Sequence, residues 1–152
     1  MSSDEVFNIR GLDKLAKAFK VKPPTARIGI LGSKDARQGD ETSNATVGAA
    51  HEFGTSKLER RSFLREPLKD HLDKAIESSH LGDKETLNEV IKTGDITGWV
   101  KQIAVLAEGI VLEAFNSNGY GKWKPSDMRY KKNHQTLIET QQLVRSITHE
   151  VK

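Results

Sequence analysis

Cysteine is absent from this chain of 152 residues. The protein therefore has no disulfide, no cysteine-ligated zinc and no thiol nucleophile, which fits folding in a reducing compartment. Aromatic residues are scarce, at 6% of the sequence, and apolar residues make up 36%. We expect a single domain over residues 1–152, with a thin core and a strongly solvated surface. We also expect such a subunit to gain stability from partner proteins.

Long apolar segments are lacking as well. The first twenty residues carry charges throughout, and the most apolar segment, 103–115, is interrupted by Glu108 and Glu113. A membrane-spanning helix needs roughly 20 predominantly apolar residues, and a secretory signal needs an apolar stretch near the N-terminus. The sequence therefore predicts neither secretion nor contact with a membrane.

A strong excess of one charge is also missing, because 24 Lys and Arg residues face 21 Asp and Glu residues. The small excess lies near the C-terminus, where Arg129, Lys131 and Lys132 cluster around Tyr130. A basic cluster with an aromatic ring can hold a nucleic-acid backbone and stack on a base, so DNA contact there is one hypothesis. A solvated loop and an interface with an acidic neighbour are the alternatives, and we prefer the interface.

Motifs for catalysis or metal binding are weak. The segment Gly29–Lys34 lacks the residue spacing of a phosphate-binding loop. His51 and Glu52 are adjacent, but a helical zinc site needs a second histidine at position 55, where Thr55 stands. We interpret this pair as partly exposed at a helix end. The sequence predicts no enzyme activity, no catalytic residue, no metal and no cofactor.

Hydrophobic spacing predicts several helices. Apolar residues recur every three or four positions from Ile96 to Phe115, which indicates a buried central helix. We expect Ser62 to be the N-cap of another helix, and Gly54 to end a short one. Shorter helices are predicted at 11–19, 45–53, 84–92 and 137–143, with a polar, mobile loop near 32–44.

Two segments at opposite ends of the chain have strand character. Residues 26–31 and 146–151 both alternate apolar and polar side chains, so they can pair with each other. The fold class predicted is α+β, with a small antiparallel sheet packed against a long central helix and several shorter helices.

Aromatic residues near charged ones are candidates for interfaces. Phe53, Phe63 and Leu64 flank the basic segment 57–61, a pattern typical of an apolar anchor with a charged rim. For Phe63 we prefer a place in the core. Trp123 lies in a glycine-rich loop, where its ring has to be buried under the loop or against a partner.

Four segments together resemble phage tail-completion and virion-morphogenesis proteins. They are VGAAHEFGT at 47–55, RSFLR at 61–65, GKWKP at 121–125 and LIETQQLVRSI at 137–147. The family shows a HEFGT block, an R-x-F-L-R block, a G-W-x-P-L block and an L-I-D-T-G-x-L-x-x-S-I block in this order. The chain departs from the pattern at Ser126, Glu139 and Gln141, where the family commonly has an apolar residue, Asp and Gly.

The resemblance implies a non-enzymatic α+β subunit of the virion, assembled in the host cytoplasm. Copies of it would form a ring, a homohexamer, at the tail–head junction, between the tail terminator or tail tube protein and a head-completion (stopper) protein. The alternative is a DNA-contacting assembly factor that uses residues 129–132 in passive contact with genomic DNA. The resemblance assigns structural or interface roles to Phe53, Gly54, Arg61, Phe63, Leu64, Arg65, Trp123 and Pro125.

Overall fold

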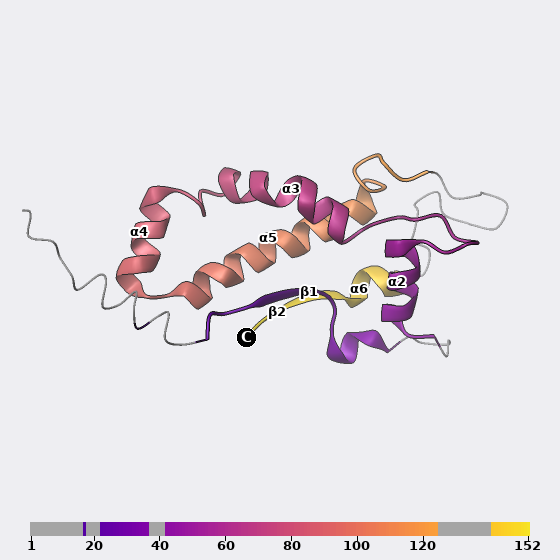
Figure 1. Ribbon diagram of the computed structural model, residues 1–152, viewed down its shortest axis with the longest axis horizontal. Coiled ribbons are helices and arrows are strands. Elements are labelled where there is room, and N and C mark those ends of the chain that lie inside the picture. Colours follow the sequence, from indigo (N-terminus) through magenta and orange to yellow (C-terminus); the bar gives the residue numbers. More distant parts are fainter. Residues whose placement is uncertain (1–16, 18–21, 37–41, 125–140) are drawn as a thin grey trace, which may run out of the picture.

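The computed structural model describes residue 17 and residues 22–36, 42–124 and 141–152. Over these ranges the chain has an α+β fold, as the sequence predicted (Figure 1). The elements in order are β1 (Ala26–Ile30), the 3-10 helix η1 (Gly32–Asp35), α2 (Asn44–Phe53), α3 (Arg65–Ser78), α4 (Lys84–Thr93), α5 (Ile96–Asn116), α6 (Gln142–Ser146) and β2 (Ile147–Val151).

The sheet joins the two ends of the described chain. Strands β1 and β2 pair antiparallel, with Ala26 opposite Val151 and Ile30 opposite Ile147. One further backbone pair extends the ladder, because the amide of Thr25 donates to the carbonyl of Lys152 at 2.7 Å and the reverse bond measures 3.1 Å. The predicted pairing of residues 26–31 with residues 146–151 is confirmed.

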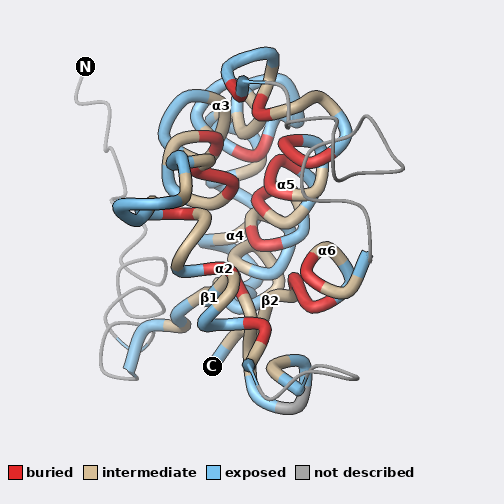
Figure 2. The backbone as a smooth tube through the Cα atoms, turned by 90° about the vertical axis from the view of Figure 1, so that its right-hand side faces the viewer, coloured by how far each residue is buried: buried red, intermediate tan, exposed pale blue. Residues whose placement is uncertain are grey.

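Helix α5 is the central element, as its apolar spacing predicted. The Asp95 carboxylate caps its first turn by accepting a hydrogen bond from the Gly98 amide at 2.8 Å. One side of the helix packs on α3 and another on the two strands. The small buried residues Ala104, Ala107 and Ala114 allow this close approach, and Figure 2 shows buried positions along α5 and the segments beside it.

The main apolar core surrounds the C-terminal half of α5. The Phe115 ring lies 5.0 Å from the Phe63 ring and 5.9 Å from the Trp123 ring, centroid to centroid, and the second pair meets edge to face. Leu143 and Ile147 close the core from α6 and β2. The core position predicted for Phe63 is confirmed, and Trp123 is buried within the chain.

Two predicted boundaries differ from the structure, and a third falls mostly outside the described residues. Helix α3 begins at Arg65 and not directly after Ser62, although the Ser62 hydroxyl accepts a hydrogen bond from the Glu66 amide in its first turn at 3.1 Å. The amides of residues 63–65 donate to the Glu52 carboxylate. The predicted loop at 32–44 begins with η1 and ends with the first residue of α2, while residues 37–41 lie outside the described ranges. Most of the helix predicted at 137–143 lies outside the described residues, and the described helix α6 spans Gln142–Ser146.

Two other predictions concern the ends of the chain and the membrane. The predicted helix at 11–19 lies outside the described residues except for residue 17. Across the ranges that the structure describes, no helix has both the length and the apolar composition required to cross a bilayer.

Candidate functional site

The Glu52 carboxylate, in the last turn of α2, organises the segment that leads into α3. Its side chain is only 5% exposed. One carboxylate oxygen accepts hydrogen bonds from the Ser62 hydroxyl at 2.8 Å, the Arg65 amide at 3.1 Å and Arg65 Nε at 3.0 Å. The other oxygen accepts from the amides of Phe63 at 2.9 Å and Leu64 at 3.0 Å. Five donors therefore converge on one buried carboxylate.

This arrangement corrects the interpretation of the His51–Glu52 pair. We expected both side chains to be partly exposed, but Glu52 is buried. Burial disfavours the charged form and acts to raise the pKa of Glu52, yet the hydrogen bonds from Leu64, Ser62 and Arg65 outweigh it. The pKa of Glu52 therefore lies below its ordinary value, and the carboxylate is charged at neutral pH.

The chain reverses direction between Glu52 and Ser62, which lets one residue bind the other. Gly54 ends α2 with a φ of 75°, and a Cβ at this position would lie 3.1 Å from the backbone nitrogen of Arg60. Thr55 accepts and donates backbone hydrogen bonds with Leu58 inside the turn. The Arg61 amide then donates to the His51 carbonyl at 2.7 Å, so the returning segment lies against the end of α2.

Phe53 follows Glu52 in the chain, and its side chain points away from the core. It is 60% exposed, the highest value among the large apolar residues that the structure describes. The Arg65 guanidinium carbon lies 4.4 Å from the centroid of the Phe53 ring, a distance typical of a cation–π contact. Because Arg65 also binds Glu52 and its side chain is 56% exposed, it joins the buried carboxylate to the surface.

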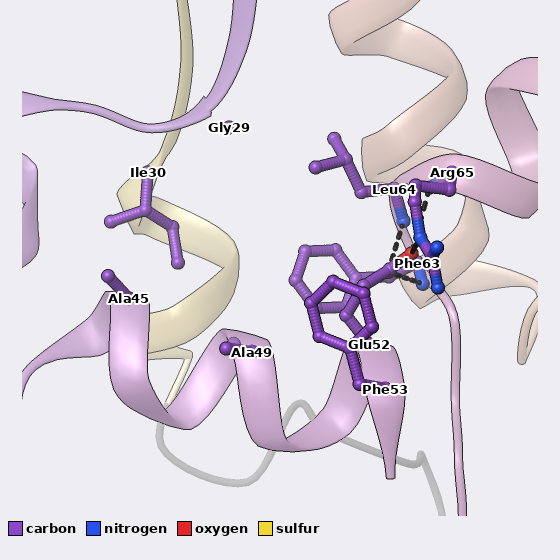
Figure 3. Close-up of a pocket in the computed structure, with 10 residues that line it drawn as sticks. Gly29, Ile30, Ala45, Ala49, Glu52, Phe53, Phe63, Leu64 and Arg65 are labelled. Carbon is purple, nitrogen blue, oxygen red and sulfur yellow. Dashed lines mark hydrogen bonds and ion pairs between the residues drawn. The ribbon is translucent and has the colours of Figure 1, made fainter.

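An apolar cavity of about 220 Å³ opens beside Phe53. Figure 3 shows Ile30, Ala45 and Ala49 on one side of it and Phe53, Leu64 and Arg65 on the other. The carboxylate of Glu52, which also lines the cavity, is already bound by its five donors. The opening therefore offers apolar walls and one cationic side chain to whatever binds there.

Trp123 connects the loop after α5 to the same segment. Its indole Nε1 donates to the Ser62 carbonyl at 3.3 Å. The loop approaches closely because Gly119 has no side chain: a Cβ there would lie 2.3 Å from Trp123 Nε1. Gly119 also has a φ of 66°, which glycine adopts readily.

The residues singled out in the sequence divide into three groups. Phe63 and Trp123 are in the core, Leu64 and Arg61 are half-buried, and Phe53 and Arg65 are at the surface, all around the junction of α2 and α3. Pro125 and the basic residues Arg129, Lys131 and Lys132 lie outside the described residues. Reasoning from the sequence missed Glu52, whose role depends on donors ten to thirteen positions later.

Comparison of the chain with protein-family models, with curated proteins and with solved structures found no match. Among the residues that the structure describes, no group of three or more His, Asp or Glu side chains is placed to hold a metal ion.

Proposed function

We propose that this protein is a structural subunit of a phage particle, a tail-completion or neck protein that forms a ring of identical copies. The ring, a hexamer, joins the tail terminator or tail tube protein to a head-completion protein at the tail–head junction. Its mechanism is adhesion between surfaces, without a chemical reaction. The observation that carries the proposal is the exposed Phe53 and Arg65 beside an apolar cavity, held in position by the motifs that resemble that family.

The four motifs meet in one region of the fold. Glu52, of the first motif, binds the backbone of the second motif through three amides. Trp123, of the third, donates to the carbonyl of Ser62 in the second. Leu143 and Ile147, of the fourth, pack in the core with Phe63. Motifs that are far apart in the sequence thus depend on one another physically, which supports reading them as one family pattern.

One departure from the family pattern is consistent with this reading. Gln141 occupies the position where the family commonly has glycine, and its φ of 55° lies in the left-handed region that favours glycine. The backbone bend that glycine would favour is therefore present at the start of α6, although the residue differs.

The surface chemistry supports protein–protein contact. Aromatic residues and arginine are enriched at the centre of protein interfaces, where a ring fills a pocket and a guanidinium binds at the edge. The Glu52 hydrogen bonds hold Phe63, Leu64 and Arg65 in fixed positions before any partner arrives, so little conformational entropy is lost on binding.

The proposal is tested by purifying the full chain and measuring its mass by native mass spectrometry, with negative-stain microscopy of the same sample. We expect a closed ring with a defined number of copies. In the phage that encodes the chain, deleting its gene should leave complete heads and complete tails that do not join, and supplying the wild-type chain should restore joined particles.

Two results would contradict the proposal. The first is a full set of infectious particles in the absence of the chain. The second is tight, salt-dependent binding of duplex DNA by the purified protein without ring formation, because that behaviour belongs to a DNA-contacting factor. Fluorescence anisotropy with labelled duplex DNA at several salt concentrations measures it.

A further inference from the structure

Three of the four exposed large apolar residues that the structure describes lie on two helices, α2 and α4, and the fourth, Val105, lies on α5. Phe53 lies at the end of α2, and Leu87 and Ile91, each 38% exposed, lie on α4. Figure 1 shows α2 and α4 at opposite ends of the long axis, with α5 running between them. Helix α5 has 21 residues, so it separates the two ends by roughly 30 Å. One molecule cannot bring these two surfaces together.

Helix α4 has an apolar face that the rest of the described chain covers only in part. No residue of the helix is buried, although its sequence is amphipathic. Leu87 and Ile91 are four positions apart and therefore lie next to each other on one face of the helix. A short amphipathic helix of this kind is the element that binds in apolar grooves of partner proteins.

The cavity beside Phe53 suits such a helix. Its volume of about 220 Å³ exceeds the roughly 150 Å³ of a cavity that holds a benzene molecule, so a large aliphatic side chain fits inside. Its walls are mostly apolar side chains of β1, α2 and the segment before α3, and the Phe53 ring flanks its opening.

The two ends also carry opposite net charge. Residues 44–66, which include the ion pair of Arg60 with Glu66, hold four basic and three acidic side chains, a net charge of +1 with histidine neutral. Residues 77–95 hold two basic and five acidic side chains, a net charge of −3. Two copies placed end to end therefore attract each other, which favours a contact between different ends over a contact between like ends.

We infer that the α4 helix of one copy docks into the cavity beside Phe53 of a second copy, with Leu87 or Ile91 as the anchor. Because the two surfaces differ, the contact is heterologous, and repeating it generates a ring if the rotation closes. This inference rests on the proposed function and specifies which surfaces build its ring. The contact area of one short helix is small, so assembly depends on protein concentration. Because the two ends carry opposite net charge, assembly also weakens at high salt.

The inference is tested with two variants that each damage one end. The double substitution Leu87→Gln and Ile91→Gln changes only exposed positions of α4, and Ala49→Trp fills the cavity from the exposed side of α2. We expect each variant to weaken assembly at least roughly tenfold, because the buried aliphatic contact is lost. Sedimentation velocity and native mass spectrometry measure assembly, and circular dichroism checks folding.

The matched control is Val105→Gln. Val105 is 58% exposed but lies on α5, neither on α4 nor in the lining of the Phe53 cavity, so this variant should assemble as the wild type does. The decisive experiment mixes the α4 variant with the Ala49→Trp variant. Each retains one intact end, so the mixture should form a dimer with one copy of each variant and no ring.

The outcomes separate this inference from the proposed function. If the α4 variant forms rings as the wild type does, the α4 contact is wrong and the proposed ring function is unaffected. Damaged variants that stay monomeric when mixed overturn the end-to-end arrangement. A wild-type chain that remains monomeric at high concentration overturns the ring itself, and the α4 contact with it.

Discussion

Replacing Glu52 with glutamine removes a charge and half of the acceptor capacity at the α2–α3 junction while keeping the side-chain size. In the protein, one carboxylate oxygen binds Ser62 and both donors of Arg65, and the other binds the amides of Phe63 and Leu64. Glutamine has one oxygen and one NH2 group, and the NH2 group cannot accept a hydrogen bond. At least two of the five donors must therefore lose their acceptor.

The cost follows from the number of orphaned donors. A buried donor left without an acceptor costs about 1–3 kcal/mol, and hydrogen bonds to a charged group contribute more than neutral ones. If the glutamine oxygen replaces the one that binds Ser62 and Arg65, the amides of Phe63 and Leu64 are orphaned, and the second lies in a partly buried contact. We expect Glu52→Gln to lower the free energy of unfolding by about 2–4 kcal/mol.

The assay is urea unfolding at neutral pH, followed by circular dichroism and by the fluorescence of the two tryptophans. Glu59→Gln is the matched control. Glu59 pairs with Lys124 at 2.7 Å, but both side chains are strongly exposed, so the loss should be below about 1 kcal/mol. Equal destabilisation by the two glutamine variants would refute the reasoning, because it would mean that the buried donors find other acceptors at no cost.

The same residue gives stability a defined dependence on pH. The pKa of Glu52 is lower in the folded protein than in the unfolded chain, where a glutamate titrates near about 4.3. Its contribution is therefore fully present above the unfolded pKa and is lost as the pH falls through the folded pKa. The difference in unfolding free energy between wild type and Glu52→Gln should be constant from about pH 6 to 8 and shrink below about pH 4.

Further predictions concern backbone positions and use the same urea assay. Gly119→Ala should destabilise the protein by about 2–4 kcal/mol, because the new methyl group meets the buried Trp123 ring and φ is 66°. Gly121→Ala shares the positive φ but has open space, so it should cost only about 1–2 kcal/mol; equal losses would exclude the clash. Gln141→Gly relieves a left-handed φ of 55° and should stabilise by up to about 1 kcal/mol, whereas a loss would show that the glutamine side chain contributes more than its strain. Gly109→Ala, on an exposed position of α5 with nothing near the added Cβ, should stabilise by about 0.5–1 kcal/mol, and a loss would contradict the open space there.

Local rules were sufficient for several elements. The apolar spacing of 96–115 gave the central helix to within one residue at its end, because a buried stripe and a helix share the same period. Gly54 ended the predicted helix at 45–53 as expected, since it adopts a positive φ that few other residues accept. The alternation of residues 26–31 and 146–151 gave both strands of the sheet.

The candidate site was only partly accessible in this way. The sequence pattern selected Phe53, Phe63 and Leu64, on either side of the basic segment 57–61, as interface candidates; the structure leaves Phe53 exposed and places Phe63 in the core. The role of Glu52 could not, since an acidic residue in a short helix has solvent exposure as its ordinary environment. The chain reversal at Gly54 brings the amides of residues 63–65 to the Glu52 carboxylate. These amides donate the hydrogen bonds that water would otherwise supply, so the carboxylate can be buried.

By itself, the sequence determined the α+β class, the central helix, the pairing of the terminal strands and the absence of thiol chemistry, because each follows from residue type or from short-range periodicity. Only the tertiary structure decided that Glu52 is a buried acceptor of five hydrogen bonds, that Trp123 donates to the Ser62 carbonyl, and that α2 and α4 lie at opposite ends. These features join residues far apart in the chain. Side-chain periodicity describes one element at a time, whereas a contact between elements depends on how they pack.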